Sequence, residues 1–283
     1  MSDLPITVYT PKSPLRNPAK LLRDMWQDLL NARELAWRLF LRDVRAQYRQ
    51  SILSYIWVFI PPLIASLPFV YLNAQGVVKI GDTPIPYAAY AIIGTTIWQV
   101  FADALNAPLR AVTAAKSMLA RINMPREAIL LSALGQIGMG FFVRLLLLIG
   151  VFIWFRLLPP PSAVLFPLGI LSLIMLGSFI GLLVTPMGLL YTDVQRSLPI
   201  ITTFLMLLTP VVYPVPQSGL AGTIAKYNPL TPLVVATRDW LTTGTTTHAA
   251  AFVTVSLSAT ALLFIVWVVF RVATPHLVAR LGN

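Results

Sequence analysis

The sequence of 283 residues contains no cysteine, and only 11% of its residues are charged. Without thiols the chain forms neither disulfide bonds nor thiolate metal sites. A water-soluble domain carries about 25% charged residues, so this composition argues against a soluble enzyme. No glycine is followed by lysine, which a nucleotide-binding P-loop requires, and neither G-x-S-x-G nor H-E-x-x-H occurs. We therefore expect no catalysis, no metal site and no cofactor in this chain.

Long apolar runs dominate what is present, since 57% of the residues are hydrophobic. A helix needs about 20 apolar residues to cross a hydrocarbon core of about 30 Å. Six runs meet this requirement, and the predicted fold is an all-α integral membrane protein. The predicted spans are residues 52–73, 87–109, 128–157, 163–190, 198–215 and 249–270.

The net charge of +11 is concentrated in alternate segments between the predicted spans, and this distribution argues against a nucleic-acid partner. With the N-terminus inside, the inner segments are 1–51, 110–127, 191–197 and 271–283, and they hold 16 of the 21 Lys and Arg residues. Such an excess is typical of cytoplasmic segments. Both termini are therefore predicted to be cytoplasmic, and the two histidines, His248 and His276, would lie on opposite sides of the membrane.

The first 50 residues are predicted to form a cytoplasmic arm followed by an amphipathic helix in the headgroup layer. Arg38, Arg42, Arg45 and Arg49 recur every three or four residues on one face, and aromatic residues recur on another. A cationic stripe of this kind binds acidic lipid. Capture of a phosphate-bearing substrate by the arginine forks is the alternative interpretation.

Two connecting segments stand out in the predicted membrane domain, residues 51–271, which precedes a cytoplasmic tail, 272–283. Residues 112–126 are too polar to span and favour a short basic helix. Residues 216–246 combine prolines with two helix-forming stretches and lie on the outer side. Taken by themselves, these residues are compatible with a plain external loop.

Five segments in order resemble the ABC-2 permeases that export polysaccharides, most closely the lipopolysaccharide O-antigen branch. The resemblance covers about residues 34–270. It rests on residues 34–64, on PYAAYAIIGTTIWQVF with KSMLARINMPREAILLSA (87–132), on YTDVQRSLPII (191–201), on LTPVVYP (208–214) and on KYNPLTPLVVATRDWL (226–241).

The resemblance implies a homodimeric permease in the bacterial inner membrane, with two copies of a separate ABC ATPase that hold ATP and Mg. The substrate would be a polysaccharide carried on undecaprenyl pyrophosphate, and residues 216–246 would form re-entrant outer gate helices. Export of a capsular or teichoic polymer, or of small amphiphiles, is the alternative. A membrane-embedded transferase is less favoured because the sequence shows no paired carboxylates, and a proton-coupled carrier because it shows no buried carboxylates.

Three sets of candidate residues complete these expectations: the first matches the family's coupling loop by position, the second comes from the arginine stripe, and the third lies on or beside the first and fifth spans, which line the family's channel. The ATPase-coupling set is Lys116, Met118, Arg121, Asn123, Pro125 and Arg126. The set for a substrate pyrophosphate or lipid headgroup is Arg38, Arg42, Arg45, Tyr48 and Arg49. The channel-lining set is Tyr55, Phe59, Phe69, Tyr71, Phe204 and Tyr213, although an aromatic belt facing lipid explains such residues equally.

Two features inside the predicted spans need an explanation. Arg144 lies deep in the third span, where a charge normally faces protein or water. We expect Arg144 to pair with another residue of the chain rather than to act directly in function. Asp103 is a candidate partner, although the predicted membrane depths of the two residues match poorly. Gly177 and Gly181 form a GxxxG pattern, for which packing within one subunit is favoured over dimerisation.

Overall fold

The computed structural model describes residues 18–49, 56–77, 81–116, 118, 125–245 and 248–281, and this part of the chain is helical without strands. For residues 18–19, 47–49 and 274–281 the backbone alone is described. The helices are α1 (Pro18–Arg49), α2 (Ile56–Ala74), α3 (Tyr87–Ala114), α5 (Arg126–Trp154), the 3-10 helix η2 (Pro161–Leu165), α6 (Phe166–Leu190), α7 (Thr192–Leu208), α8 (Gly219–Tyr227), α9 (Leu230–Thr242) and α10 (Ala249–Leu281). The all-α class predicted from the sequence is confirmed.

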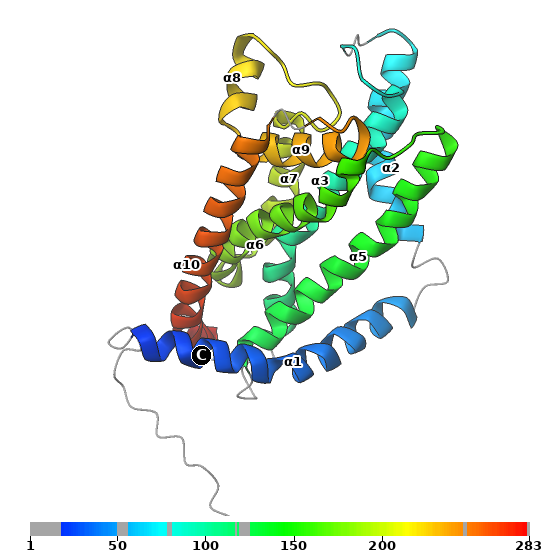
Figure 1. Cartoon of the computed structure of the whole chain (residues 1–283). Helices are drawn as coiled ribbons and strands as arrows, with labels where there is room; N and C mark the ends of the chain where they lie inside the picture. The colour runs from blue at the N-terminus through cyan, green and yellow to red at the C-terminus, as the bar shows by residue number, and fades with distance from the viewer. Residues whose placement is uncertain are drawn as a thin grey trace, which may run out of the picture.

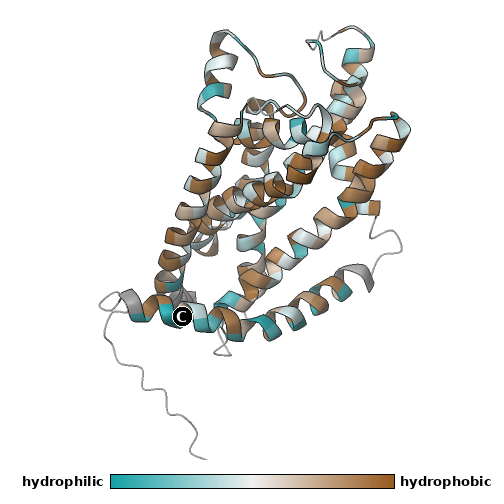
Figure 2. Ribbon diagram, viewed as in Figure 1, coloured by the Kyte–Doolittle hydropathy of each residue, from teal (hydrophilic) through white to brown (hydrophobic). Residues whose placement is uncertain are grey.

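The long helices form a bundle with a different cover at each end. α1 lies crosswise over one end, where α5 begins and the C-terminus lies, whereas α8 and α9 lie at the opposite end (Figure 1). We call these the α1 end and the α9 end. Brown, apolar residues cover α5, α6 and α10, while α1 alternates teal and brown along its length (Figure 2), as an interfacial helix does.

Five helical segments are long and apolar enough to cross a membrane: Ile56–Ala74, Tyr87–Ala114, Arg126–Trp154, Pro161–Leu190 and Ala249–Ala273. They correspond to five of the six predicted spans. α10 also continues as a helix to Leu281, so residues 272–281 of the predicted tail continue the helix of the last span.

The remaining predicted span, 198–215, differs from the structure. α7 has 17 residues and ends at Leu208, so it is about 26 Å long, at the short end of the lengths that cross a hydrocarbon core. Thr209 adopts extended backbone angles, which is what steric contact with the ring of a following proline, here Pro210, imposes. The proline, which the sequence placed inside the span, instead ends the helix.

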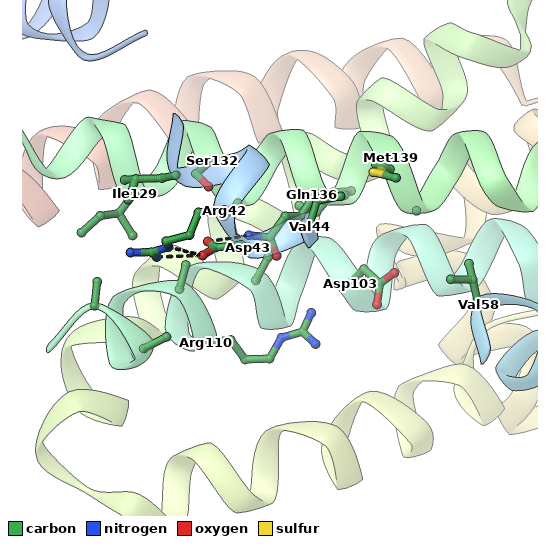
Figure 3. Close-up of a pocket in the computed structure, with 18 of the residues that line it drawn as sticks. Arg42, Asp43, Val44, Val58, Asp103, Arg110, Ile129, Ser132, Gln136 and Met139 are labelled. Atoms are coloured by element: carbon green, nitrogen blue, oxygen red, sulfur yellow. Dashed lines mark hydrogen bonds and ion pairs between the residues drawn. The ribbon is translucent and has the colours of Figure 1, made fainter. Parts of the chain in front are cut away.

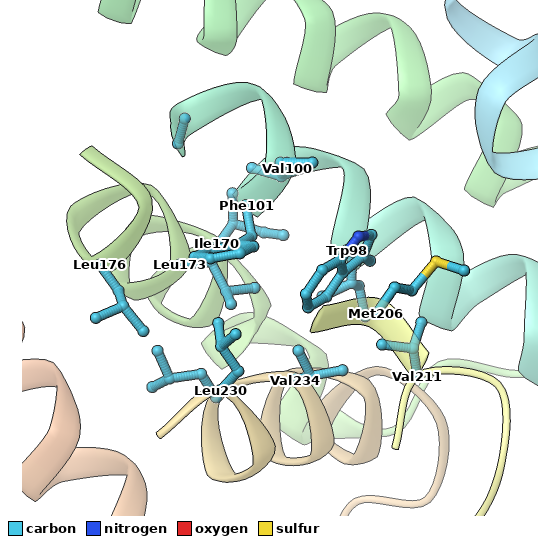
Figure 4. Packing of buried hydrophobic residues seen from close by; sticks show 14 of the residues in the cluster. Trp98, Val100, Phe101, Ile170, Leu173, Leu176, Met206, Val211, Leu230 and Val234 are labelled. Carbon is cyan, nitrogen blue, oxygen red and sulfur yellow. The ribbon is translucent and has the colours of Figure 1, made fainter. Parts of the chain in front are cut away.

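α3 is the centre of the bundle and packs against α2, α5, α6, α7 and α9. Trp98 and Phe101 of α3 lie fully buried against Leu173 of α6 and Leu233 of α9. Figure 4 shows side chains from these helices meeting in one apolar cluster. Most residues of α3 are buried by protein, whereas α2 and α10 leave most of their apolar surface uncovered.

Close packing of α6 on α3 depends on the two glycines of the GxxxG pattern. A Cβ at Gly177 would lie 2.8 Å from the Phe101 carbonyl oxygen, and one at Gly181 would lie 2.2 Å from the Leu105 carbonyl oxygen. Both contacts are within the chain, which agrees with the prediction that the pattern packs helices of one subunit.

Gly181→Ala is therefore expected to lower the free energy of unfolding by about 1–3 kcal/mol, because the added methyl group forces α6 and α3 apart. The matched control is Gly150→Ala in α5, where a Cβ meets nothing within 4 Å. The control is expected to be neutral or to stabilise by up to about 1 kcal/mol, since alanine favours helix. Thermal denaturation in detergent measures both. Equal effects of the two substitutions would contradict this packing.

Candidate functional site at the two ends of the bundle

At the α9 end, a buried arginine joins three elements. Arg238 of α9 is 2% exposed, and its guanidinium donates hydrogen bonds to the carbonyl oxygens of Pro210 (3.2 Å) and Val211 (3.0 Å). The same guanidinium lies 3.9 Å above the ring centre of Tyr90 on α3. Because the two carbonyls follow the end of α7, Arg238 fixes α9 to both α3 and α7.

Asn228 makes a second connection between α7 and α9. Its amide donates a hydrogen bond to the Thr209 hydroxyl (2.9 Å), and its side-chain oxygen accepts one from the Leu230 amide (2.9 Å) at the start of α9. The Tyr90 hydroxyl donates to the Tyr213 carbonyl (3.2 Å). Tyr90, residues 209–213, Asn228 and Arg238 thus form one interlocked unit, which we call the outer cluster.

The outer cluster decides between the two interpretations of residues 216–246. The two predicted helical stretches are present as α8 and α9, and every residue from Leu230 to Arg238 is buried. The plain external loop is therefore wrong for α9. Burial raises the pKa of the Asp239 carboxyl, and the adjacent Arg238 cation opposes that shift.

At the α1 end, one arginine joins three helices through two carboxylates. Arg271 of α10 donates to Glu127 of α5 (2.6 Å) and to Asp28 of α1. The Glu127 side chain is only 7% exposed. These three residues, which we call the arginine–carboxylate triad, hold α1 to the first turn of α5.

The predicted coupling residues lie at this same end. Lys116 is exposed, and Met118 is half-buried against an apolar cluster formed by α1, α3, α5, α6 and α10. Pro125 precedes the first residue of α5, Arg126, whose guanidinium contacts the Arg271 carbonyl oxygen at 3.5 Å. Two further predicted residues, Arg121 and Asn123, lie outside the described residues.

The predicted arginine stripe lies on α1. Arg38 pairs with Glu34 (2.7 Å), and Arg42 pairs with Asp43 (2.7 Å), while Arg45 is exposed. The helix includes Tyr48 and Arg49, but their side chains lie outside the described residues.

The structure does not bring the predicted channel residues together into one lining within the chain. Phe59 and Phe69 are half-buried on α2, and Tyr71 is exposed there. Phe204 is exposed on α7, whereas the Tyr213 hydroxyl donates to the Leu207 carbonyl (2.7 Å). α2 packs on α3 and α5, and α7 packs on α3, α6 and α8. Tyr55, the last of the set, lies outside the described residues.

Arg144 does pair with Asp103, at 2.7 Å, so the doubt about their depths was wrong. α5 crosses the bundle obliquely (Figure 1), and it packs against α3, the helix that carries Asp103. Both residues line a cavity of about 440 Å³ between α1, α2, α3 and α5, together with Arg42, Asp43 and Arg110. Figure 3 shows Asp43 in this cavity between Arg42 and Gln136.

Sequence reasoning missed the roles of Arg238 and Arg271. Arg238 falls in the predicted outer segment 216–246, although it follows the apolar run PLVVAT, a setting in which a charge marks a buried partner. For Arg271 the sequence gives no comparable signal, because its partners lie 144 and 243 residues away.

Comparisons with known proteins agree with this architecture. The family model described as ABC-2 type transporter matches residues 34–242. A protein named O-antigen export system permease protein RfbA from Klebsiella pneumoniae is 23% identical over 209 residues, which cover 72% of this chain and 78% of the relative. A protein of the same name from Myxococcus xanthus is 22% identical over 220 residues, covering 77% of this chain and 82% of the relative.

Proposed function

Because the chain belongs to the ABC-2 type transporter family, we propose that it is the permease for a lipid-linked polysaccharide, most specifically an O-antigen. The chain is a multi-pass membrane protein and the membrane component of a transporter rather than a catalytic subunit. ABC-2 permeases work with an ATPase subunit. The observation that carries the polysaccharide assignment is the similarity to O-antigen permeases over 72–77% of the chain.

The proposed location is the bacterial inner membrane, with both termini and the α1 end in the cytoplasm. Two of the segments rich in Lys and Arg, α1 and the end of α10, lie at that end, together with the start of α5 (Figure 1). The α9 end then faces outward, so α8 and α9 would cover the outer mouth of the pathway as gate helices.

The proposed working unit is two copies of this chain with two copies of an ABC ATPase. α2 and α7 both carry large apolar residues that the single chain leaves exposed, among them Trp57, Leu67, Tyr71, Ile200 and Phe204. A second copy would cover these faces and close a channel between α2 and α7 of each chain. Phe59, Phe69, Tyr71 and Phe204 are the described aromatic residues that would then contact the sugar chain.

In the proposed mechanism, the movement driven by the ATPase, which we call the stroke, enters this chain at residues 116–126. ATPase closure would push this segment, and Pro125 passes the displacement directly into α5. The arginine–carboxylate triad then carries the movement from the first turn of α5 to α1 and α10, because Arg271 holds both neighbours. The α1 arginines would meanwhile hold the headgroup layer, or the pyrophosphate of the substrate, at the entrance.

Lys116→Glu is expected to lower polysaccharide export about tenfold, because reversing a charge at a docking surface disfavours the partner. The matched control is Lys226→Glu, which changes another exposed lysine on α8 at the opposite end. Surface polysaccharide is measured in a strain that lacks the chromosomal gene, complemented with each variant. Equal loss from both variants would contradict the docking role.

Deletion of the gene distinguishes export of polysaccharide from export of another cargo. We expect the deletion to abolish surface polysaccharide and to leave lipid-linked polymer inside the cell. Unchanged surface polysaccharide, combined with an ATPase complex stimulated by small amphiphiles, would instead assign the amphiphile exporter. ATP hydrolysis by the purified chain alone would contradict the division of labour between the two subunits.

A further inference from the structure

The cavity between α1, α2, α3 and α5 carries more positive charge than its own carboxylates balance. Its charged lining residues are Arg42, Arg110 and Arg144 against Asp43 and Asp103. Arg42 pairs with Asp43, and Arg144 pairs with Asp103. Arg110 makes no hydrogen bond or ion pair with the part of the chain that the structure describes. The lining therefore holds one unbalanced cation.

Arg144 itself is incompletely satisfied. The residue is 5% exposed, and one of its terminal nitrogens donates to Asp103. Its Nε and its other terminal nitrogen, Nη1, have no hydrogen-bond partner within the described residues. Buried donors without a partner cost about 1–3 kcal/mol each, and more when they are charged. An acceptor group entering the cavity would recover this energy.

The position of the cavity limits which acceptor can enter. α1 forms one wall with Leu39, Arg42 and Val44, and α1 is the interfacial helix. Arg42 and Arg110 are exposed, whereas Arg144 is buried, so donors run from an accessible mouth to a buried inner end. Asp43 is already occupied, because it accepts from Arg42 (2.8 Å) and from Gln136 (3.2 Å) (Figure 3).

We propose that this cavity binds a phosphate or diphosphate group, held by Arg110 and by a donor of Arg144 that has no partner in the described residues. Guanidinium groups match phosphate oxygens with paired, charge-assisted hydrogen bonds. In the empty cavity Asp103 holds Arg144 as an internal anion, and the entering phosphate competes with it. The binding group belongs either to the headgroup of an amphiphile that enters past α1 or to a free cytosolic anion. This assignment does not depend on what polymer the transporter exports.

The probes are farnesyl diphosphate, farnesol and inorganic pyrophosphate, titrated onto the purified full-length chain in a neutral detergent. We expect farnesyl diphosphate to bind and farnesol not to bind at the same concentrations. Competition by pyrophosphate would show that the phosphate group is sufficient, and its failure to compete would show that an attached lipid tail is needed. Both results support the site, and they identify the source of the group.

Three variants test the residues. Arg144→Gln and Arg110→Gln are each expected to weaken farnesyl diphosphate binding about tenfold, because each removes charge-assisted hydrogen bonds. Asp103→Asn is expected to strengthen binding about threefold, because it removes the competing carboxylate. The control is Arg196→Gln, an exposed arginine on α7 outside the cavity, which should bind as the unsubstituted chain does.

Arg144→Gln and Asp103→Asn are expected to change binding in opposite directions, and this distinguishes a binding site from a purely structural ion pair. If the Arg144→Gln protein does not fold, the Arg110→Gln protein still tests the site, because the Arg110 side chain is exposed. Asp103→Asn gives the second measurement. Unchanged binding in Arg110→Gln, weaker binding in Asp103→Asn, or equal binding of farnesol and farnesyl diphosphate would each overturn the proposal. None of these measurements concerns export, so failure of the binding proposal is distinguishable from failure of the proposed function.

Discussion

Arg238→Ala is expected to lower the free energy of unfolding by about 4 kcal/mol and to release α9 from the end of the bundle. The substitution removes a buried side chain of large volume, which leaves a cavity costing about 2–5 kcal/mol. It also strips the Pro210 and Val211 carbonyl oxygens of their donor, and unsatisfied buried acceptors cost about 1–3 kcal/mol each. The contact with the Tyr90 ring is lost as well.

The measurement is the thermal denaturation of the purified chain in detergent, with proteolysis after residue 215 as the local readout. Arg238→Lys is expected to recover only part of the loss, because an ammonium group lacks the planar guanidinium that lies over the Tyr90 ring. Lys226→Ala on the neighbouring α8 is the control and should change stability by less than about 0.5 kcal/mol. An Arg238→Ala protein as stable as this control would show that the outer cluster does not hold α9.

Arg271→Ala is expected to lower the free energy of unfolding by about 3 kcal/mol, because it leaves the Glu127 carboxylate buried without a counter-ion. The same change in an exposed pair should cost far less. Arg38 and Glu34 are also joined at 2.7 Å, but both side chains are 75% exposed. Arg38→Ala is therefore expected to change stability by less than about 0.5 kcal/mol.

A second substitution separates charge burial from loss of packing. In the Arg271→Ala background, Glu127→Gln removes the uncompensated charge and should restore part of the stability. In the unsubstituted chain, Glu127→Gln should instead destabilise, since it weakens the bond to Arg271. If Arg271→Ala were as mild as Arg38→Ala, the triad would not connect α1 to α5, and the proposed route for the stroke would fail.

Much of the architecture follows from local properties of the sequence. Long apolar runs predicted five of the membrane-crossing segments, and the charge and aromatic periodicity predicted α1 as an interfacial helix. The prolines and apolar stretches after residue 216 predicted α8 and α9. These features are readable because hydropathy and helix propensity act over about 20 neighbouring residues, without reference to the rest of the fold.

The end of the sixth predicted span shows where such reasoning fails. The apolar run 198–215 is long enough to span, but Pro210 ends the helix at Leu208. The chain tolerates this end because Arg238 and Asn228 donate hydrogen bonds to oxygen atoms of residues 208–211. Whether a proline kinks or ends an apolar helix depends on such partners, and these partners lie 19 to 28 residues away.

By itself, the sequence determined that the chain enters a membrane as helices and predicted which helix lies along its surface, because transferring apolar side chains out of water dominates the energy of each segment. The tertiary structure alone decided which charges are buried and what they hold. Arg144 with Asp103, Arg238 with Tyr90, and Arg271 with Glu127 each join distant segments. A buried charge is stable only beside a partner, and the crossing of the helices, rather than their sequence spacing, sets which partner it meets.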